Sequence, residues 1–227
     1  MCPFSDDDYW VYPLNFNFNY FCNSYSDIVL DNNGYIVFKS STSCDTTGCP
    51  ISRPTSGNII SALNYDLYTG CGTGCGTVQY KNALASDLTL IGNQISQHFA
   101  SFSPTNAFII TYDNVVQCCN VNSLVSSFQI ILSTDSVSSF VTIIYDTCLS
   151  GSGTPYYTGL DYIDQNQQFN QMIISNPCGS SNVGVTGLWI FDVSCTQILT
   201  TTDTTTDTTT DTTTDTTTVK AKRYLSI

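Results

Sequence analysis

The sequence predicts a mainly β fold: sandwich-like antiparallel sheets with one amphipathic helix, followed by an extended low-complexity tail. Short runs of β-branched and aromatic residues, separated by turn residues, recur throughout the first 199 residues, as is typical of sandwich-like β proteins. One segment breaks this pattern with the apolar periodicity of a helix. Residues 200–227 are dominated by threonine, and the threonine tract within them cannot form a packed core.

The first strand is expected in PLNFNFNYF, where the apolar residues from Leu14 to Tyr20 alternate with asparagines. The segment DIVLDNNGYIVFKS indicates a hairpin, because Asn33 and Gly34 readily supply the positive φ of a tight turn. Further strands are expected in AFIITYDNVVQ, SSFQIILSTDS, SSFVTIIYDT and TGLWIFDVS.

The helix is expected near residues 86–100. Apolar residues there recur at helical spacing and form a single stripe: Leu84, Leu88, Ile91, Ile95 and Phe99. Ser86 is the expected N-cap, and Pro104 is expected to end the helical segment. This stripe predicts that the helix packs on a sheet.

Charge is scarce and strongly acidic. The chain has 18 aspartates, no glutamate and 6 basic residues, giving a net charge of −12. The body up to Leu199 has 14 aspartates and 3 basic residues, a net charge of −11. Nucleic-acid binding needs clustered lysine and arginine, so no nucleic-acid partner is expected. Anionic membrane surfaces are disfavoured for the same reason, and no apolar stretch reaches transmembrane length.

Eleven cysteines predict a disulfide framework in an oxidising compartment, so the protein is expected to be secreted or at the cell surface. At least four disulfides are expected within residues 2–195, and their pairing stays open. A metal–thiolate site is the minor alternative, since no C-x-x-C pair occurs. The odd number leaves one thiol free or paired with another chain. The candidates are Cys22, Cys44, Cys49, Cys71, Cys75, Cys118, Cys119, Cys148, Cys178 and Cys195.

The N-terminus MCPFSDDDYW lacks the basic start and apolar run of a secretory signal peptide. Because secretion is expected, we expect that Met1 is not the start of the natural precursor. No N-x-S/T sequon occurs, so N-glycosylation is not expected.

No catalytic, cofactor or metal site is predicted. A Ser-His-Asp triad would require His98, which lies beside the helical stripe, and no G-x-S-x-G elbow is present. The aspartates nearest to aromatic residues, Asp66, Asp113 and Asp161, fit loop-end and turn roles better than paired catalytic carboxylates.

Three local motifs resemble parts of known binding sites. SDDDYW lacks the spaced oxygen ligands of a calcium loop, and CGTGCG lacks the lysine of a phosphate-binding loop. A surface for stacking sugars is the alternative use of Tyr156, Tyr157 and Tyr162, which are expected in a Gly/Ser-rich loop.

The tract from Thr200 to Thr218 repeats TTTD and contains fifteen threonines. Threonine-rich tracts of secreted chains are typical carriers of O-linked glycans. Extended, these nineteen residues span about 60 Å, which exceeds the diameter expected of the body. O-glycans are expected on Thr200, Thr201, Thr202, Thr204, Thr205, Thr206, Thr208, Thr209, Thr210, Thr212, Thr213, Thr214, Thr216, Thr217 and Thr218.

The last nine residues, VKAKRYLSI, hold half of the chain's basic residues. In a strand their apolar side chains share one face: Val219, Ala221, Leu225 and Ile227. We expect this segment to be a self-assembly strand donated to a neighbouring subunit. KAKR is alternatively a processing site for a dibasic protease.

The order of motifs FNFNYF, IVLDNNGYIVF, IISALNYDLYTG, GTVQYK, AFIITYDNV, SFQIILSTDSVSSFVTIIYD and GVTGLWIFDV resembles the NIDO domain of nidogen, the tectorins and membrane-associated mucins. The resemblance covers roughly residues 12–194. Tyr65 and Tyr112 depart from the family's usual residues. The resemblance implies an extracellular, non-catalytic module and transfers no binding residues. The expected domains are a disulfide-rich NIDO-like body (1–199), a TTTD tether (200–218) and a basic C-terminal hook (219–227).

Two functions therefore stay open. The first is a structural subunit that polymerises head to tail into an extracellular glycosylated filament, with itself and O-linked glycans as partners. The alternative is an adhesive, ligand-binding NIDO head on a mucin-like stalk of a larger surface protein. The role of VKAKRYLSI discriminates them, because only the filament requires this segment to dock in a neighbour.

Overall fold

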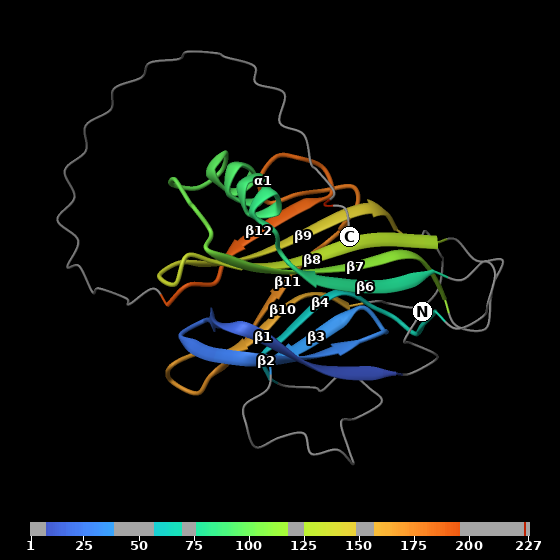
Figure 1. Ribbon diagram of the computed structural model, residues 1–227. Helices are drawn as coiled ribbons and strands as arrows, with labels where there is room; N and C mark the ends of the chain where they lie inside the picture. Colours follow the sequence, from blue (N-terminus) through green and yellow to red (C-terminus); the bar gives the residue numbers. More distant parts are fainter. Residues whose placement is uncertain are drawn as a thin grey trace, which may run out of the picture.

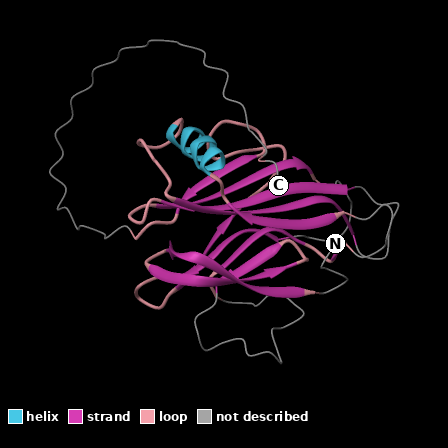
Figure 2. Ribbon diagram, viewed as in Figure 1, coloured by secondary structure: helices cyan, strands magenta, loops and turns pink. Residues whose placement is uncertain are grey.

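Two antiparallel sheets stack face to face, and a single described helix covers the outer face of the second sheet (Figures 1 and 2). The computed structural model describes residues 8–38, 57–69, 76–117, 125–148, 157–195 and 225. The predicted mainly β sandwich with one amphipathic helix is thereby confirmed for the body.

The first sheet, sheet A, follows the order β1 (Tyr9–Tyr20), β2 (Asn23–Asp31), β3 (Tyr35–Phe38), β4 (Ile59–Asn64), β10 (Tyr157–Ile163) and β11 (Phe169–Ile173). The second, sheet B, follows the order β12 (Leu188–Asp192), β9 (Ser139–Thr147), β8 (Val125–Thr134), β7 (Asn106–Gln117) and β5 (Leu67–Tyr68). The strand β6 (Thr77–Asn82) also pairs with β7. All pairings are antiparallel.

The predicted alternation in β1 is confirmed by burial: Leu14, Phe18 and Tyr20 are fully buried, whereas the intervening asparagines are exposed or half-buried. The predicted hairpin turn is also confirmed. Gly34 has a φ of +80°, and a Cβ atom there would lie 2.0 Å from the Leu63 carbonyl oxygen. The turn therefore requires glycine for both its backbone conformation and its close packing on β4.

The sequence places Tyr157 and Tyr162 in a Gly/Ser-rich loop, and this expectation is wrong. Both lie in β10, which is flanked on either side by β4 and β11 in antiparallel pairing. The glycine-rich composition before β10 hid the strand, because its apolar alternation is short and broken by Gly159 and Asp161.

The core has two layers. The inner layer lies between the sheets and gathers apolar residues from both. The outer layer lies between sheet B and the helix, and it includes Ile91 and Ile95 of the helix, Ile131 of β8 and Ile144 of β9. Nine of the ten residues of β8 are buried, since both of its faces are covered.

Buried tyrosines join the two sheets by hydrogen bonds. The Tyr112 hydroxyl of β7 donates to the Asp31 carbonyl of β2, and the Tyr145 hydroxyl of β9 donates to the Ala62 carbonyl of β4. Burial raises the pKa of Tyr112 well above its ordinary value, and the Asp31 charge adds to this effect. The phenol therefore stays protonated as a donor over the whole neutral range.

The helix α1 spans Ala85–Ser96, which confirms the predicted helical segment, but Ser86 is not its N-cap. Leu84 occupies that position, and its N–H donates to the Asp87 carboxylate over 2.8 Å. Asp87 also pairs with the Lys81 ammonium at 3.0 Å. Burial raises the pKa of the Asp87 carboxyl, but the Leu84 N–H and Lys81 outweigh it, so the pKa lies below its ordinary value.

The helix ends earlier than residue 100 because Ser96 ties down the chain that follows. Its hydroxyl accepts the Phe102 N–H over 2.9 Å. Phe102 then packs edge-on against Phe140 of β9, with ring centroids 4.7 Å apart. The chain thus turns back onto sheet B instead of continuing the helix.

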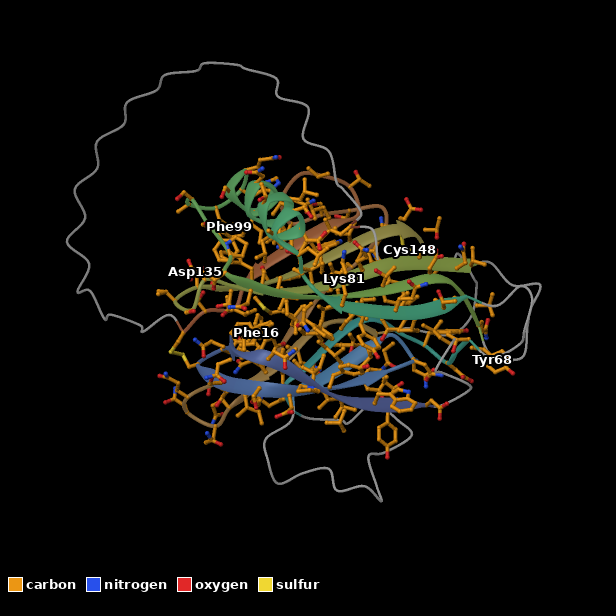
Figure 3. The ribbon with its side chains drawn as sticks, viewed as in Figure 1. Phe16, Tyr68, Lys81, Phe99, Asp135 and Cys148 are labelled. Atoms are coloured by element: carbon orange, nitrogen blue, oxygen red, sulfur yellow. A yellow bond between two sulfur atoms is a disulfide. The ribbon has the colours of Figure 1, made fainter. Side chains whose placement is uncertain are left out.

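Two disulfides lie within the described residues. Cys22, in the β1–β2 turn, pairs with Cys195 across a sequence separation of 173, and Cys148 (labelled in Figure 3) pairs with Cys178 across a separation of 30. Disulfide bonding is thereby confirmed for these four cysteines. The other predicted cysteines lie outside the described residues: Cys44, Cys49, Cys71, Cys75, Cys118 and Cys119.

Candidate functional site

The most specific site lies on the outer face of sheet B, where Leu225 of the C-terminal segment is docked. Gln129 stands near the middle of β8 and is fully buried. Its Nε2 donates to the Leu225 carbonyl over 2.7 Å, and its Oε1 accepts the Leu225 N–H over 3.0 Å. One side-chain amide thus binds both main-chain polar groups of residue 225, as a neighbouring strand would.

The geometry of Gln129 is set by its own neighbours in the sheet. Its Nε2 also donates to the hydroxyl of Thr111, its partner on β7, over 2.7 Å. The Thr111 hydroxyl could accept or donate, but the Leu225 carbonyl can only accept, so the amide nitrogen must face that carbonyl. The acceptor oxygen is consequently aimed at the Leu225 N–H.

The Leu225 side chain supplies the apolar half of the contact. It is only 5% exposed and belongs to the outer core layer together with Ile131 and Ile144. Burying a leucine side chain contributes about 1.5–3 kcal/mol. The bonds to Gln129 use only main-chain atoms, which every residue has, so they do not depend on the side chain at position 225. The apolar surroundings therefore provide the selectivity for leucine.

Sequence reasoning proposed Leu225 as a self-assembly residue, and the structure places it in a docking site on its own body. The other three proposed positions, Val219, Ala221 and Ile227, lie outside the described residues. Gln129 was missed. The available signal was a lone amide inside the apolar run SFQIIL, since a buried polar group needs a partner.

The fold separates the three aspartates that lie nearest to aromatic residues in the sequence. Asp113 lies in β7 of sheet B, where its carboxylate accepts a bond from the Asn114 amide over 3.0 Å. Asp161 lies fully buried in β10 of sheet A and is bound by the Tyr157 hydroxyl and the Gln171 amide. Asp66 is exposed between β4 and β5. His98 follows the end of the helix, and its main-chain N–H donates to the Ile95 carbonyl.

The tyrosines considered as a sugar-stacking surface serve internal contacts. The Tyr157 hydroxyl donates to Asp161, and the Tyr162 ring stacks on Phe21 with centroids 3.6 Å apart. Tyr156 lies outside the described residues. Tyr157 and Tyr162 thus stabilise sheet A.

Across the part of the chain that the structure describes, no group of three or more potential metal ligands gathers. Within the same residues, no helix has the length and apolar character needed to cross a membrane.

Comparison with known proteins gives one family and one distant relative. The family model of the nidogen-like domain (NIDO) matches residues 26–195. Alpha-tectorin of Gallus gallus is 26% identical over 215 residues, a match that covers 82% of this chain. The chain spans only about a tenth of the length of this curated relative, since 10% of alpha-tectorin is covered. No solved structure gives a significant match.

Proposed function

The chain belongs to the nidogen-like (NIDO) domain family, and from that premise we propose that it is a non-catalytic structural glycoprotein whose subunits join head to tail into a filament. The family match and the disulfides make it an extracellular NIDO-containing protein. The filament is supported by the docking of Leu225 against Gln129.

The same contacts can form between two copies. Gln129 binds main-chain atoms, and nothing in that recognition depends on which chain supplies residue 225. Exchange of an identical segment between protomers is a low-cost route to assembly. Each body then accepts the segment of one neighbour and donates its own to the next. Where these contacts do not close into a ring, an open filament results.

The span of the chain between Cys195 and Leu225, which contains the TTTD tether, determines whether Leu225 docks on its own body or on a neighbouring body. Twenty-nine residues separate Cys195 from Leu225. As a flexible coil they have a root-mean-square span of about 30 Å, whereas fully extended they reach about 90 Å. A flexible tether gives a millimolar effective concentration of the segment at its own body. O-glycans that crowd the threonines would hold the tether extended, lower that concentration and favour a neighbouring body.

Charge supports the encounter of two subunits. The body has a net charge of −11, whereas the C-terminal nine residues contain Lys220, Lys222 and Arg223. Complementary charge of this kind accelerates association more than it strengthens the final complex. We therefore expect filament growth to slow at high ionic strength.

A mixing experiment distinguishes exchange between chains from docking within one chain. A chain lacking residues 219–227 retains the acceptor site but has no segment to donate. The Gln129→Leu chain retains the segment but loses the amide that holds it. Mixed at equal concentration, the two should form a one-to-one dimer that cannot grow, detected by mass photometry.

Each variant alone should remain a folded monomer, and the unaltered glycosylated chain should show filaments by negative-stain microscopy. Filaments formed by the chain lacking residues 219–227 would refute the proposal. Absence of the mixed dimer, with both variants folded, would indicate that docking occurs only within one chain. The intact mass of native material tests the glycans, since a mass equal to the bare polypeptide would exclude them.

The alternative function, an adhesive head on a mucin-like stalk, predicts single heads in the same micrographs. Its C-terminal segment would dock only within its own chain, and the mixed dimer would not form.

A further inference from the structure

A polar hollow of about 340 Å³ opens at one end of the sandwich, between the two sheets. One wall is the β1–β2 hairpin, with Phe16, Asn17, Asn19 and Ser24. The other wall is the start of β7 and the β8–β9 turn, with Asn106, Thr134 and Ser136. Figure 3 labels Phe16 and Asp135, the neighbour of Ser136, and shows the two walls at the same end of the molecule. We propose that this hollow binds a neutral pyranose unit of a glycan.

The hydrogen-bonding groups of the hollow suit a polyhydroxylated, uncharged ligand. Six of its seven lining residues carry an amide or a hydroxyl, and none carries an ionisable group. Each amide offers both donors and acceptors, and each hydroxyl offers both in one atom. Sugar hydroxyls need the same mixture. Phosphate and carboxylate ligands lack a basic partner here, and the net charge of the body opposes them.

Several of these groups are not used by the fold. Within the described residues, the side chains of Asn17, Asn19 and Ser24 make no hydrogen bond. Thr134 differs, because its hydroxyl donates to the Ser138 carbonyl over 2.8 Å and accepts the Ser136 N–H over 3.0 Å. The hairpin wall therefore offers the free groups, and the turn wall is held rigid by its own bonds.

Phe16 provides an apolar surface among the polar groups. It is half-buried and packs against the inner core layer, so its ring is held in place. The register of β1 against β2 shifts between Pro13 and Phe18, and Asn15 within this bulge has a φ of +58°. Bulges commonly re-aim side chains beside functional sites. A fixed aromatic ring suits the C–H face of a pyranose, while the asparagines suit its hydroxyl rim.

The volume and the position of the hollow further restrict which ligand it can bind. A volume of about 340 Å³ lies at the small end of the usual range of about 300–1,000 Å³, which suits one sugar unit. Asn19 and Ser24 pair across the hairpin whose Cys22 is bonded to Cys195. The threonine tract begins five residues after Cys195 and is thus within about 17 Å of that bond. The sugar is therefore either an O-glycan of the chain's own tract or a unit of a foreign glycan.

The test uses the full chain in two forms, one made without O-glycosylation and one carrying its natural glycans. Saturation-transfer NMR with N-acetylgalactosamine, galactose, N-acetylglucosamine and mannose should show millimolar binding of at least one sugar to the unglycosylated chain. The double variant Asn17→Ala/Asn19→Ala should weaken it at least tenfold, and Phe16→Leu, which keeps an apolar side chain against the core but removes the ring, should weaken it similarly. Asn93→Ala, an exposed asparagine of α1, is the matched control and should bind normally.

The glycosylated chain distinguishes the two sources. If its own tract fills the hollow, it should not bind free sugar, whereas equal binding by both forms assigns the hollow to a foreign glycan. No binding by the unglycosylated chain at tens of millimolar, or unchanged binding by the asparagine double variant, overturns the proposal. Binding of free sugar does not require filaments, so this inference and the proposed assembly fail independently.

Discussion

Replacing Leu225 by alanine tests the docking site directly. The leucine side chain is 5% exposed within the outer core layer. Truncating a buried leucine to alanine costs about 2–5 kcal/mol, and a terminal segment that can relax lies at the low end. A loss of about 2–3 kcal/mol raises the undocked fraction about 30- to 150-fold.

Limited trypsin digestion measures that fraction. The bond after Arg223 lies two residues before the Leu225 N–H that Gln129 binds. A protease must bind several residues in an extended form, so cleavage there requires undocking. When opening and closing are fast, the cleavage rate follows the open population. Leu225→Ala should therefore speed cleavage at Arg223 about 30-fold or more.

Two further variants make this prediction decisive. Gln129→Leu removes both main-chain bonds to residue 225 and should also speed cleavage, with the fold retained by circular dichroism. Val137→Ala alters an apolar residue that is 79% exposed in the β8–β9 turn and should leave the rate unchanged. If Leu225→Ala is cleaved at the unaltered rate, Leu225 is not docked in solution and the candidate site is refuted.

Three other predictions concern the body of the domain. Tyr112→Phe should lower the free energy of unfolding in urea by about 1–3 kcal/mol, because the buried Asp31 carbonyl loses its donor. An unchanged free energy of unfolding would show that the Tyr112 hydroxyl does not bind Asp31. Because burial raises the pKa of Tyr112, stability should fall as pH rises above about 10, and less so in the phenylalanine variant. Asp87→Asn should cost about 1 kcal/mol at pH 7. Its lowered pKa means that this difference is lost as pH falls below about 4, so a pH-independent difference would contradict the assignment. Replacing Cys22 and Cys195 by serine should cost about 3–5 kcal/mol by calorimetry, because their bond closes a loop with a separation of 173; an unchanged melting temperature would show that the bond is not formed.

Local patterns in the sequence were sufficient to predict the class of the fold. Alternation in FNFNYF, the Asn-Gly turn and the runs around β7, β8 and β9 are local signals, since side-chain period and turn conformation depend on neighbouring residues. The helical stripe is local in the same way. The disulfide framework and the resemblance to NIDO domains also came from the sequence, and the family match confirms the latter.

Features that depend on contacts between distant parts of the chain could be seen only in the folded protein. Cys22 and Cys195 pair across 173 positions, and cysteine spacing cannot reveal such a partner. Leu84 became the N-cap instead of Ser86, because Asp87 binds its N–H and is itself held by Lys81 from β6. The strand β10 forms because β4 and β11 flank it, even though Gly159 weakens its local preference.

The candidate sites show the same division. The alternation of VKAKRYLSI pointed to Leu225 as a docking residue, since an apolar face requires something to cover it. That its main chain meets Gln129 was decided only by the fold, which brings together residues 96 positions apart. The polar hollow likewise brings together residues from both sheets. In the sequence alone, its asparagines and serines have the pattern of ordinary strand-end and turn residues.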